Sequence, residues 1–146
     1  MEQKKDKILH DILKAYGDLK KPNFEFVMRS YNSPKYQKLL DELHLEFKIE
    51  DNTDLNCNTC ISLHLPYCRK SVYVYISLVS PYAFLFYERK VMENDDSFSK
   101  ILLSHNFVLL NKSELLDGFD IDASSFGIER KKATVLELLF SFGLSL

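Results

Sequence analysis

Two alternations of polar and apolar residues stand back to back in the middle of the chain, and they constrain its fold more than any other feature. They cover Cys60–Leu65 and Val72–Leu78, with Pro66-Tyr67-Cys68-Arg69-Lys70 between them. Alternation with a period of two is typical of strands that bury one face. The two segments therefore predict neighbouring strands of an antiparallel sheet. Their polar face carries hydrogen-bonding side chains: Ser62, His64, Tyr73, Tyr75 and Ser77.

Two further segments complete the predicted sheet. Residues 43–50 also alternate, which predicts a strand with His44 and Glu46 on its polar face. Pro81 cannot donate a ladder hydrogen bond, so we place it in the turn before a fourth strand at Tyr82–Arg89. The simplest arrangement of these strands is a meander.

Segments on both sides of the predicted strands have apolar residues at helical spacing. It predicts helices over residues 6–19, 98–105 and 113–116, a helix that opens at Ser33-Pro34 and ends near Leu43, and a last helix over Ala133–Phe142. Thr134-x-x-Glu137 predicts a capping box for that last helix. Phe24–Tyr31 fits either a short strand or an aromatic turn. We expect an α+β fold in which an antiparallel meander of four to five strands packs against N- and C-terminal helices.

Length and composition predict one globular domain over residues 1–146. A chain of 146 residues can bury roughly two-thirds of its unfolded surface without metal or disulfide support. No apolar run approaches the roughly 18 residues that span a bilayer, because Ser77, Ser80 and Pro81 interrupt the most apolar stretch. The charged start of the chain does not lead into the apolar core of an export signal. We therefore expect a cytoplasmic protein without a membrane partner.

Charge is distributed unevenly along the chain. Residues 1–40 hold nine Lys and Arg against five Asp and Glu, whereas residues 91–129 hold two against eight. The net charge of −2 gives no general attraction to phosphate backbones, so nucleic-acid binding would need a local basic patch, and we do not expect a nucleic-acid partner. The acidic segment could attract a basic protein instead.

The nearest approach to a metal motif is Cys57-x-x-Cys60-x-x-x-His64-x-x-x-Cys68. Its spacing is one residue short of a zinc knuckle in two gaps, and no glycine occurs between Gly17 and Gly118 to form the turns of a knuckle. Nothing after Cys60 predicts the helix that activates a redox Cys-x-x-Cys pair. We expect neither a metal nor another cofactor.

Catalytic motifs are also missing. The chain has no glycine-flanked serine, phosphate-binding loop, His-Glu-x-x-His sequence or dinucleotide fingerprint. One alternative stays open, in which His44, His64, Tyr73 and Tyr75 share a sheet face with Glu46 as an acid–base cluster or the floor of a ligand pocket.

The polar-aromatic face supports three other interpretations. Tyrosine is enriched at the centres of protein interfaces, so the face could bind a protein. It could instead be covered by a helix, as ordinary core. A surface on which RNA bases stack is the third, but its accompanying basic residues and Lys/Arg-Gly-aromatic signature are missing.

Two stretches suggest a class of proteins: Val72-Tyr73-Val74-Tyr75-Ile76-Ser77-Leu78-Val79-Ser80-Pro81-Tyr82 and Ala133-Thr134-Val135-Leu136-Glu137-Leu138-Leu139-Phe140-Ser141. With these, its size and its α+β organisation, the chain resembles small bacterial immunity proteins of polymorphic or contact-dependent toxin systems. The resemblance covers the C-terminal half and implies a non-catalytic cytoplasmic protein that binds one cognate toxin. Such families diverge quickly, so no functional position is carried over.

The leading hypothesis is therefore a protein-binding domain that neutralises a toxin by direct contact. The sheet-side contacts that we predict are His44, His64, Tyr73 and Tyr75. The acidic contacts that we predict for a basic toxin are Asp95, Asp96, Asp117, Asp120 and Asp122.

Overall fold

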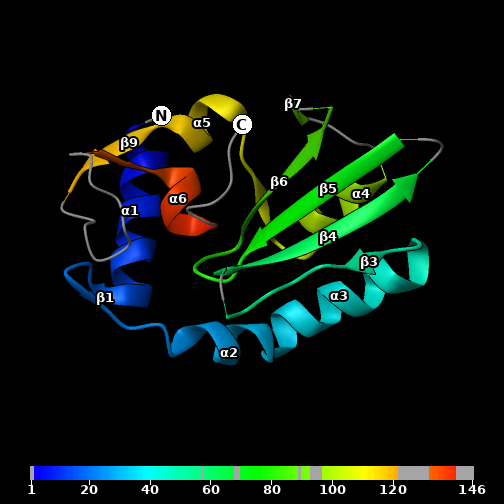
Figure 1. Ribbon diagram of the computed structural model, residues 1–146, viewed down its shortest axis with the longest axis horizontal. Helices are drawn as coiled ribbons and strands as arrows, with labels where there is room; N and C mark the ends of the chain where they lie inside the picture. Colours follow the sequence, from blue (N-terminus) through cyan, green and yellow to red (C-terminus); the bar gives the residue numbers. More distant parts are fainter. Residues whose placement is uncertain are drawn as a thin grey trace.

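The computed structural model describes residues 2–56, 58–67, 70–88, 90–92, 97–121 and 132–140. These residues combine helices with a mostly antiparallel sheet, which confirms the predicted α+β class. In Figure 1, helices α1, α5 and α6 gather on the left, the main sheet occupies the right, and α3 runs along the lower edge.

The main sheet is a meander extended at both edges. Its strands lie in the order β3 (Glu50–Asp51), β4 (Cys60–Tyr67), β5 (Lys70–Ser77), β6 (Tyr82–Tyr87) and β7 (Lys90–Met92), all antiparallel. β8 (Val108–Leu109) pairs in parallel with the start of β6, beside the place where β7 pairs with its end. The predicted strands at 60–65, 72–78 and 82–89 are thus present with nearly the expected bounds.

Helix α1 (Glu2–Tyr16) ends at a glycine. Gly17 has φ +78°, a left-handed conformation that side chains rarely tolerate, and it starts a hairpin of β1 (Gly17–Asp18) and β2 (Lys21–Pro22). The hairpin leads the chain into α2 (Phe26–Tyr31). The segment Phe24–Tyr31, for which the sequence suggested either a short strand or an aromatic turn, is therefore mostly helical.

Helix α3 (Pro34–Glu46) corrects the first predicted strand. Proline occupies its first turn as expected, but the helix continues three residues beyond Leu43. Its buried stripe repeats at helical spacing through Leu39, Leu40 and Leu43, whereas Leu45 is 86% exposed. The helical period therefore overrides the short alternation, and the first strand is reduced to β3.

The C-terminal third alternates short helices and strands. They are α4 (Phe98–Ser104), β8, α5 (Lys112–Leu116), β9 (Gly118–Asp120), β10 (Lys132–Thr134) and α6 (Val135–Leu139). β9 and β10 pair with each other in a separate two-stranded sheet. Both α5 and α6 begin with capping boxes, from Asn111 with Glu114 and from Thr134 with Glu137, and the second confirms the sequence prediction.

Two buried tyrosines join the helices to the rest of the core. Tyr16 on α1 donates to the carbonyl oxygen of Leu138 on α6 at 3.0 Å, and Tyr36 on α3 donates to that of Ser77 on β5 at 2.7 Å. Burial raises the pKa of Tyr16 to about 12 and the pKa of Tyr36 further above its usual range. Both hydroxyls are therefore fixed as neutral donors at physiological pH.

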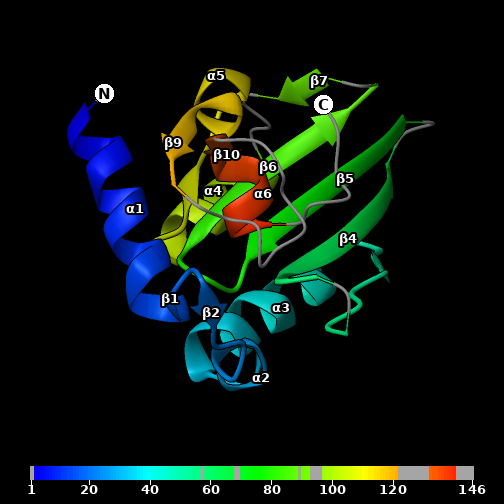
Figure 2. The same cartoon turned by 60° about the vertical axis from the view of Figure 1, so that its left-hand side comes forward.

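Helices lie against the main sheet on more than one side. Turning the view by 60° shows α6 beside β5 and β6, with α3 below the strands (Figure 2). The sheet face formed by Leu63, Val74 and Leu85 is buried in the same core as the apolar residues of α3 and α4. Within the described residues, no helix has both the length and the apolar character required to cross a membrane.

Candidate functional site

A row of five side chains crosses the main sheet from edge to edge on its polar-aromatic face. The strand register pairs Glu50 with His64, His64 with Tyr73, Tyr73 with Phe86, and Phe86 with Val91. Directly opposed residues of antiparallel strands point to the same face, so all five share one surface. We refer to Glu50, His64, Tyr73, Phe86 and Val91 as the cross-strand row.

His64 is held in place by Glu50. Its Nδ1 lies 3.0 Å from the Glu50 Oε2, with the imidazole 17% exposed and the carboxylate 63% exposed. Since a carboxylate accepts hydrogen bonds, Nδ1 carries a proton. The other ring nitrogen, Nε2, is buried and makes no hydrogen bond within the described part of the chain. An unpaired buried polar atom costs about 1–3 kcal/mol, so the His64 ring is held in this position at some cost to the stability of the fold.

Tyr73 lies flat against His64. Their rings stack with centroids 4.8 Å apart and an interplanar angle of 23°, and Tyr73 remains 38% exposed. This pair therefore offers an amphipathic aromatic surface whose geometry is fixed by two paired strands.

The next row, toward the other end of the strands, is less accessible. Tyr75 stacks on Phe84 with centroids 5.0 Å apart, and Phe84 meets Phe140 edge to face at 4.8 Å. Burial raises the pKa of Tyr75, with Cys60 and Tyr73 as smaller causes. Tyr75 thus lies between the exposed row and the core.

Helix α6 and the turn after it cover the far end of the same face. Ser77 is buried and donates from Oγ to the carbonyl oxygen of Leu139 at 2.6 Å, while Thr59 donates from Oγ1 to that of Phe140 at 3.1 Å. The polar-aromatic face is therefore divided: its Ser77 end is core and its His64 end carries the cross-strand row.

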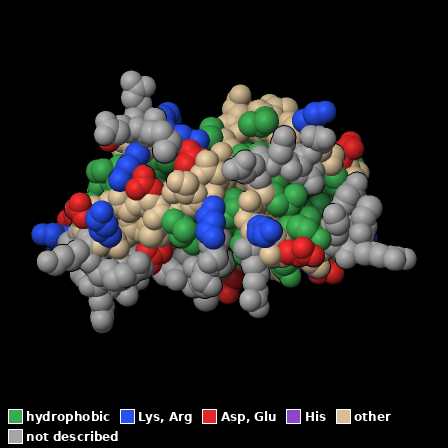
Figure 3. Space-filling model, turned by 90° about the horizontal axis from the view of Figure 1, so that it is seen from above, with side chains coloured by type: hydrophobic (Ala, Val, Ile, Leu, Met, Phe, Trp, Pro, Cys, Tyr) green, Lys and Arg blue, Asp and Glu red, His purple; other side chains and the backbone are tan. Residues whose placement is uncertain are grey.

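Hydrophobic side chains gather on one part of the surface in the space-filling view. Seen from above, hydrophobic side chains, a class that includes tyrosine, are exposed together on the right-hand half of the molecule, the half that contains the main sheet (Figure 3). Acidic and basic side chains border this group. The right-hand half thus presents a mixed apolar and charged surface.

His44 does not lie on the polar-aromatic face of the sheet. His44 and Glu46 lie on the exposed side of α3, because the segment that carries them is a helix and not a strand. The predicted grouping of His44 with His64, Tyr73 and Tyr75 is therefore wrong, and Glu50 takes the place beside His64 that Glu46 was expected to share.

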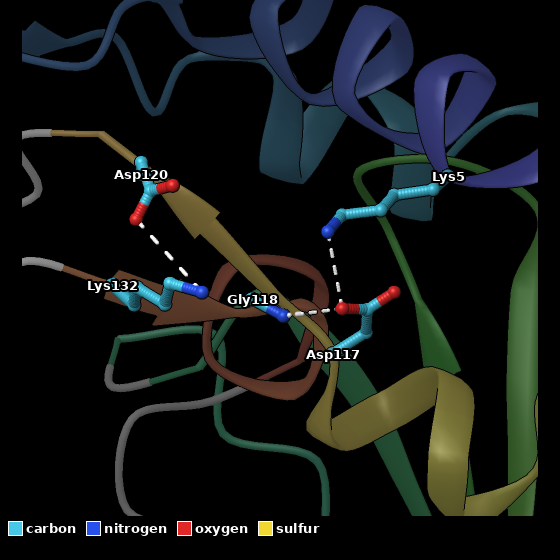
Figure 4. Close-up of polar contacts among 5 residues, drawn as sticks. All are labelled: Lys5, Asp117, Gly118, Asp120 and Lys132. Carbon is cyan, nitrogen blue, oxygen red and sulfur yellow. Dashed lines mark hydrogen bonds and ion pairs between the residues drawn. The ribbon is translucent and has the colours of Figure 1, made fainter. Parts of the chain in front are cut away.

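Two of the five predicted acidic contacts, Asp117 and Asp120, lie within the described residues. Asp117 pairs with Lys5 of α1 at 3.1 Å and accepts from the backbone nitrogen of Gly118 at 2.9 Å, while Asp120 lies 4.0 Å from Lys132 (Figure 4). The hydrogen bond from Lys5 lowers the pKa of Asp117, and the bond from Gly118 adds to the effect. Asp120 is 81% exposed, so its carboxylate is the more accessible of the two. Asp95, Asp96 and Asp122 lie outside the described residues.

Cys60 is the only member of the Cys-x-x-Cys sequence within the described residues, since Cys57 lies outside them, as does Cys68. Its thiol is buried and lies 3.9 Å from the Ser62 hydroxyl. Among the described residues, no three His, Cys, Asp or Glu side chains gather in a way that could hold a metal ion.

Cys60 should react only after unfolding. Burial raises the pKa of its thiol to about 12, so only about one thiol in ten thousand is ionised at pH 8. We expect alkylation of Cys60 by iodoacetamide to be at least about 100-fold slower in the native protein than in urea, because the thiolate is the nucleophile. Peptide-resolved mass spectrometry separates Cys60 from Cys57 and Cys68. Equal rates in the native and unfolded states would contradict this burial.

Sequence reasoning missed Glu50, Phe86 and Val91. The alternation in 43–50 placed Glu50 on a polar strand face, but nothing in the sequence gave the register that sets it opposite His64. Phe86 follows Tyr82 and Phe84 at a spacing of two, which could have assigned it to the polar-aromatic face. Val91 belongs to an edge strand that ends within three residues.

Comparison of the chain with protein-family models, curated proteins and solved structures finds no match.

Proposed function

We propose that this protein is a non-catalytic binding domain that acts as an immunity protein, neutralising a cognate bacterial toxin through the cross-strand row. The observation that carries the proposal is the His64–Tyr73 stack, a partly exposed aromatic pair whose geometry is fixed by two paired strands.

The physical basis is preorganisation. Tyrosine and histidine present large amphipathic areas with few rotatable bonds, and the stack restricts those bonds before a partner arrives. Binding therefore loses less conformational entropy than it would on a mobile loop.

The toxin assignment takes its support from the resemblance and the chemistry together. The resembling stretches include most of β5 and all of α6, which respectively carry Tyr73 and cover the far end of the face. A domain of this kind would act by occupying the toxin's active site or a surface next to it. Of the acidic contacts, Asp120 fits a basic toxin better than Asp117, because Lys5 already neutralises Asp117.

A second candidate is an enzyme or small-ligand binder built on Glu50 and His64. A carboxylate that holds Nδ1 of a histidine is part of the arrangement of a general base, but the Nε2 that would take the proton is buried here. In addition, Cys60 is a protonated buried thiol, and the Ser62 hydroxyl contacts Cys60 instead of His64. Three cavities whose linings consist of described residues, with volumes of about 190, 250 and 350 Å³, are lined by residues other than His64, Tyr73 and Tyr75.

Site-specific photo-crosslinking separates these two candidates. A benzophenone amino acid replaces Tyr73 in one variant and Leu103, which is 56% exposed on α4, in a control variant. We expect irradiation in the native cells to join residue 73, but not residue 103, to one protein that carries a toxin domain. Absence of any crosslinked protein at residue 73, or the same products from both positions, would contradict the proposal.

A further inference from the structure

A second surface, which is lined by no residue of the cross-strand row, is a groove rimmed by cations. It has a volume of about 350 Å³ and lies among α1, α2, the first turn of α3 and the β5–β6 connection. Its rim carries Lys14, Arg29 and Lys35, one from each helix, and all three are exposed. Its floor includes the buried side chains of Phe26, Tyr36 and Leu78. We refer to it as the basic groove.

The one acidic side chain that lines the groove is already compensated. The carboxylate of Asp11 accepts from Ser80 Oγ at 2.9 Å and from Tyr82 OH at 3.4 Å, and it pairs with Lys7 at 3.4 Å. Because these three contacts hold the Asp11 carboxylate against neighbouring side chains, its negative charge is compensated within the protein. The groove is therefore electropositive toward solvent.

The three cationic side chains differ in how firmly other residues hold them. Lys35 is positioned, because its ammonium donates to the carbonyl oxygen of His105 at 3.2 Å and lies 5.0 Å from the centre of the Phe107 ring. The side chains of Lys14 and Arg29 make no hydrogen bond or ion pair with any other residue that the structure describes. Two of the three rim charges are thus available for a ligand.

The N-terminus of α3 adds to the positive charge of the basic groove. Ser33 precedes the helix, but its hydroxyl donates to the carbonyl oxygen of Ser30 at 2.6 Å and does not cap the helix. The backbone N–H groups of Lys35 and Tyr36 therefore receive no acceptor from the Ser33 side chain, and they add the positive end of a 13-residue helix to a groove lined by Ser30, Lys35 and Tyr36.

We propose that the basic groove binds an acidic peptide segment of a partner protein, with carboxylates at the rim and an apolar side chain on the floor. Charge complementarity selects the carboxylates. The apolar floor distinguishes a peptide from a nucleic-acid strand, whose backbone would need a longer track of cations than three residues. The inference does not depend on the function of the cross-strand row.

Fluorescence anisotropy with a defined probe tests this proposal. The probe is a fluorescein-labelled octapeptide of glutamate interrupted by one phenylalanine and one leucine. Its comparison probes are the same peptide with lysine in place of glutamate, and a single-stranded 12-nucleotide DNA. The variant is Lys14→Glu/Arg29→Glu, and the control is Lys38→Glu/Lys100→Glu, which makes the same change in net charge at exposed positions outside the groove.

We expect the acidic peptide to bind and the lysine peptide not to bind. The groove variant should weaken acidic-peptide binding by at least about tenfold, and the control variant by less than about threefold, because close charge contacts act locally. Equal weakening in both variants, or no binding by the wild type, would overturn the proposal. Tighter binding of the DNA than of the peptide, with the same loss in the groove variant, would overturn it in favour of nucleic acid.

Discussion

Replacing Phe140 with alanine is expected to lower the free energy of unfolding by about 3–5 kcal/mol. The ring is fully buried and meets Phe84 of β6 edge to face at 4.8 Å, so alanine would leave a cavity between the turn after α6 and the sheet. Urea unfolding followed by circular dichroism measures the change, since the chain has no tryptophan to report it.

The matched control is Leu45→Ala. Leu45 is 86% exposed, so its truncation should change the free energy of unfolding by less than about 0.5 kcal/mol. If Phe140→Ala were as mild as this control, Phe140 would not be part of the core. The division of the polar-aromatic face into a covered end and an exposed end would then be wrong.

Replacing Tyr73 with alanine is expected to raise the dissociation constant of the crosslinked partner by about 30- to 1000-fold, the range of an interface hot spot. The substitution removes the most exposed ring of the cross-strand row and the aromatic surface that holds His64. Tyr73→Phe should retain much of the affinity, because the ring and its stack remain. Isothermal titration calorimetry with purified proteins measures the dissociation constants of the wild type and of both variants.

Leu103→Ala provides the comparison for this loss. Leu103 is an exposed apolar residue on α4, and its truncation should change the dissociation constant by less than about threefold. The His64→Ala/Tyr73→Ala double variant should fall short of additivity by about 0.5–1.5 kcal/mol, since the two rings contact each other. Equal affinities for Tyr73→Ala and Leu103→Ala would place the interface elsewhere.

The parts of the fold that the sequence predicts correctly depend on local signals. The alternation of β4 and β5 follows from the strand pleat, and the Thr134–Glu137 capping box follows from spacing within one helical turn. The prediction of a strand over residues 43–50 was wrong, because this segment fits both the two-residue period of a strand and the continuing period of a helix. The four alternating apolar residues from Leu43 to Ile49 could not outweigh a buried helical stripe that starts seven residues earlier, at Tyr36.

The candidate site could be predicted only in part. His64, Tyr73 and Tyr75 were expected to share a face because their strands are adjacent, and the structure confirms this. The place of Glu50 depends on register, and the cover over Ser77 depends on a helix more than fifty residues later. The basic groove was missed because its three cations come from three different helices.

Protection of growth is the measurement that tests the central claim most directly. The toxin domain of the protein crosslinked at residue 73 is expressed in a bacterial host together with either wild-type protein or the His64→Ala/Tyr73→Ala variant, at matched levels. Our account predicts that the wild type restores growth and that the folded double variant does not. Equal protection by both, or no protection by the wild type, would contradict it.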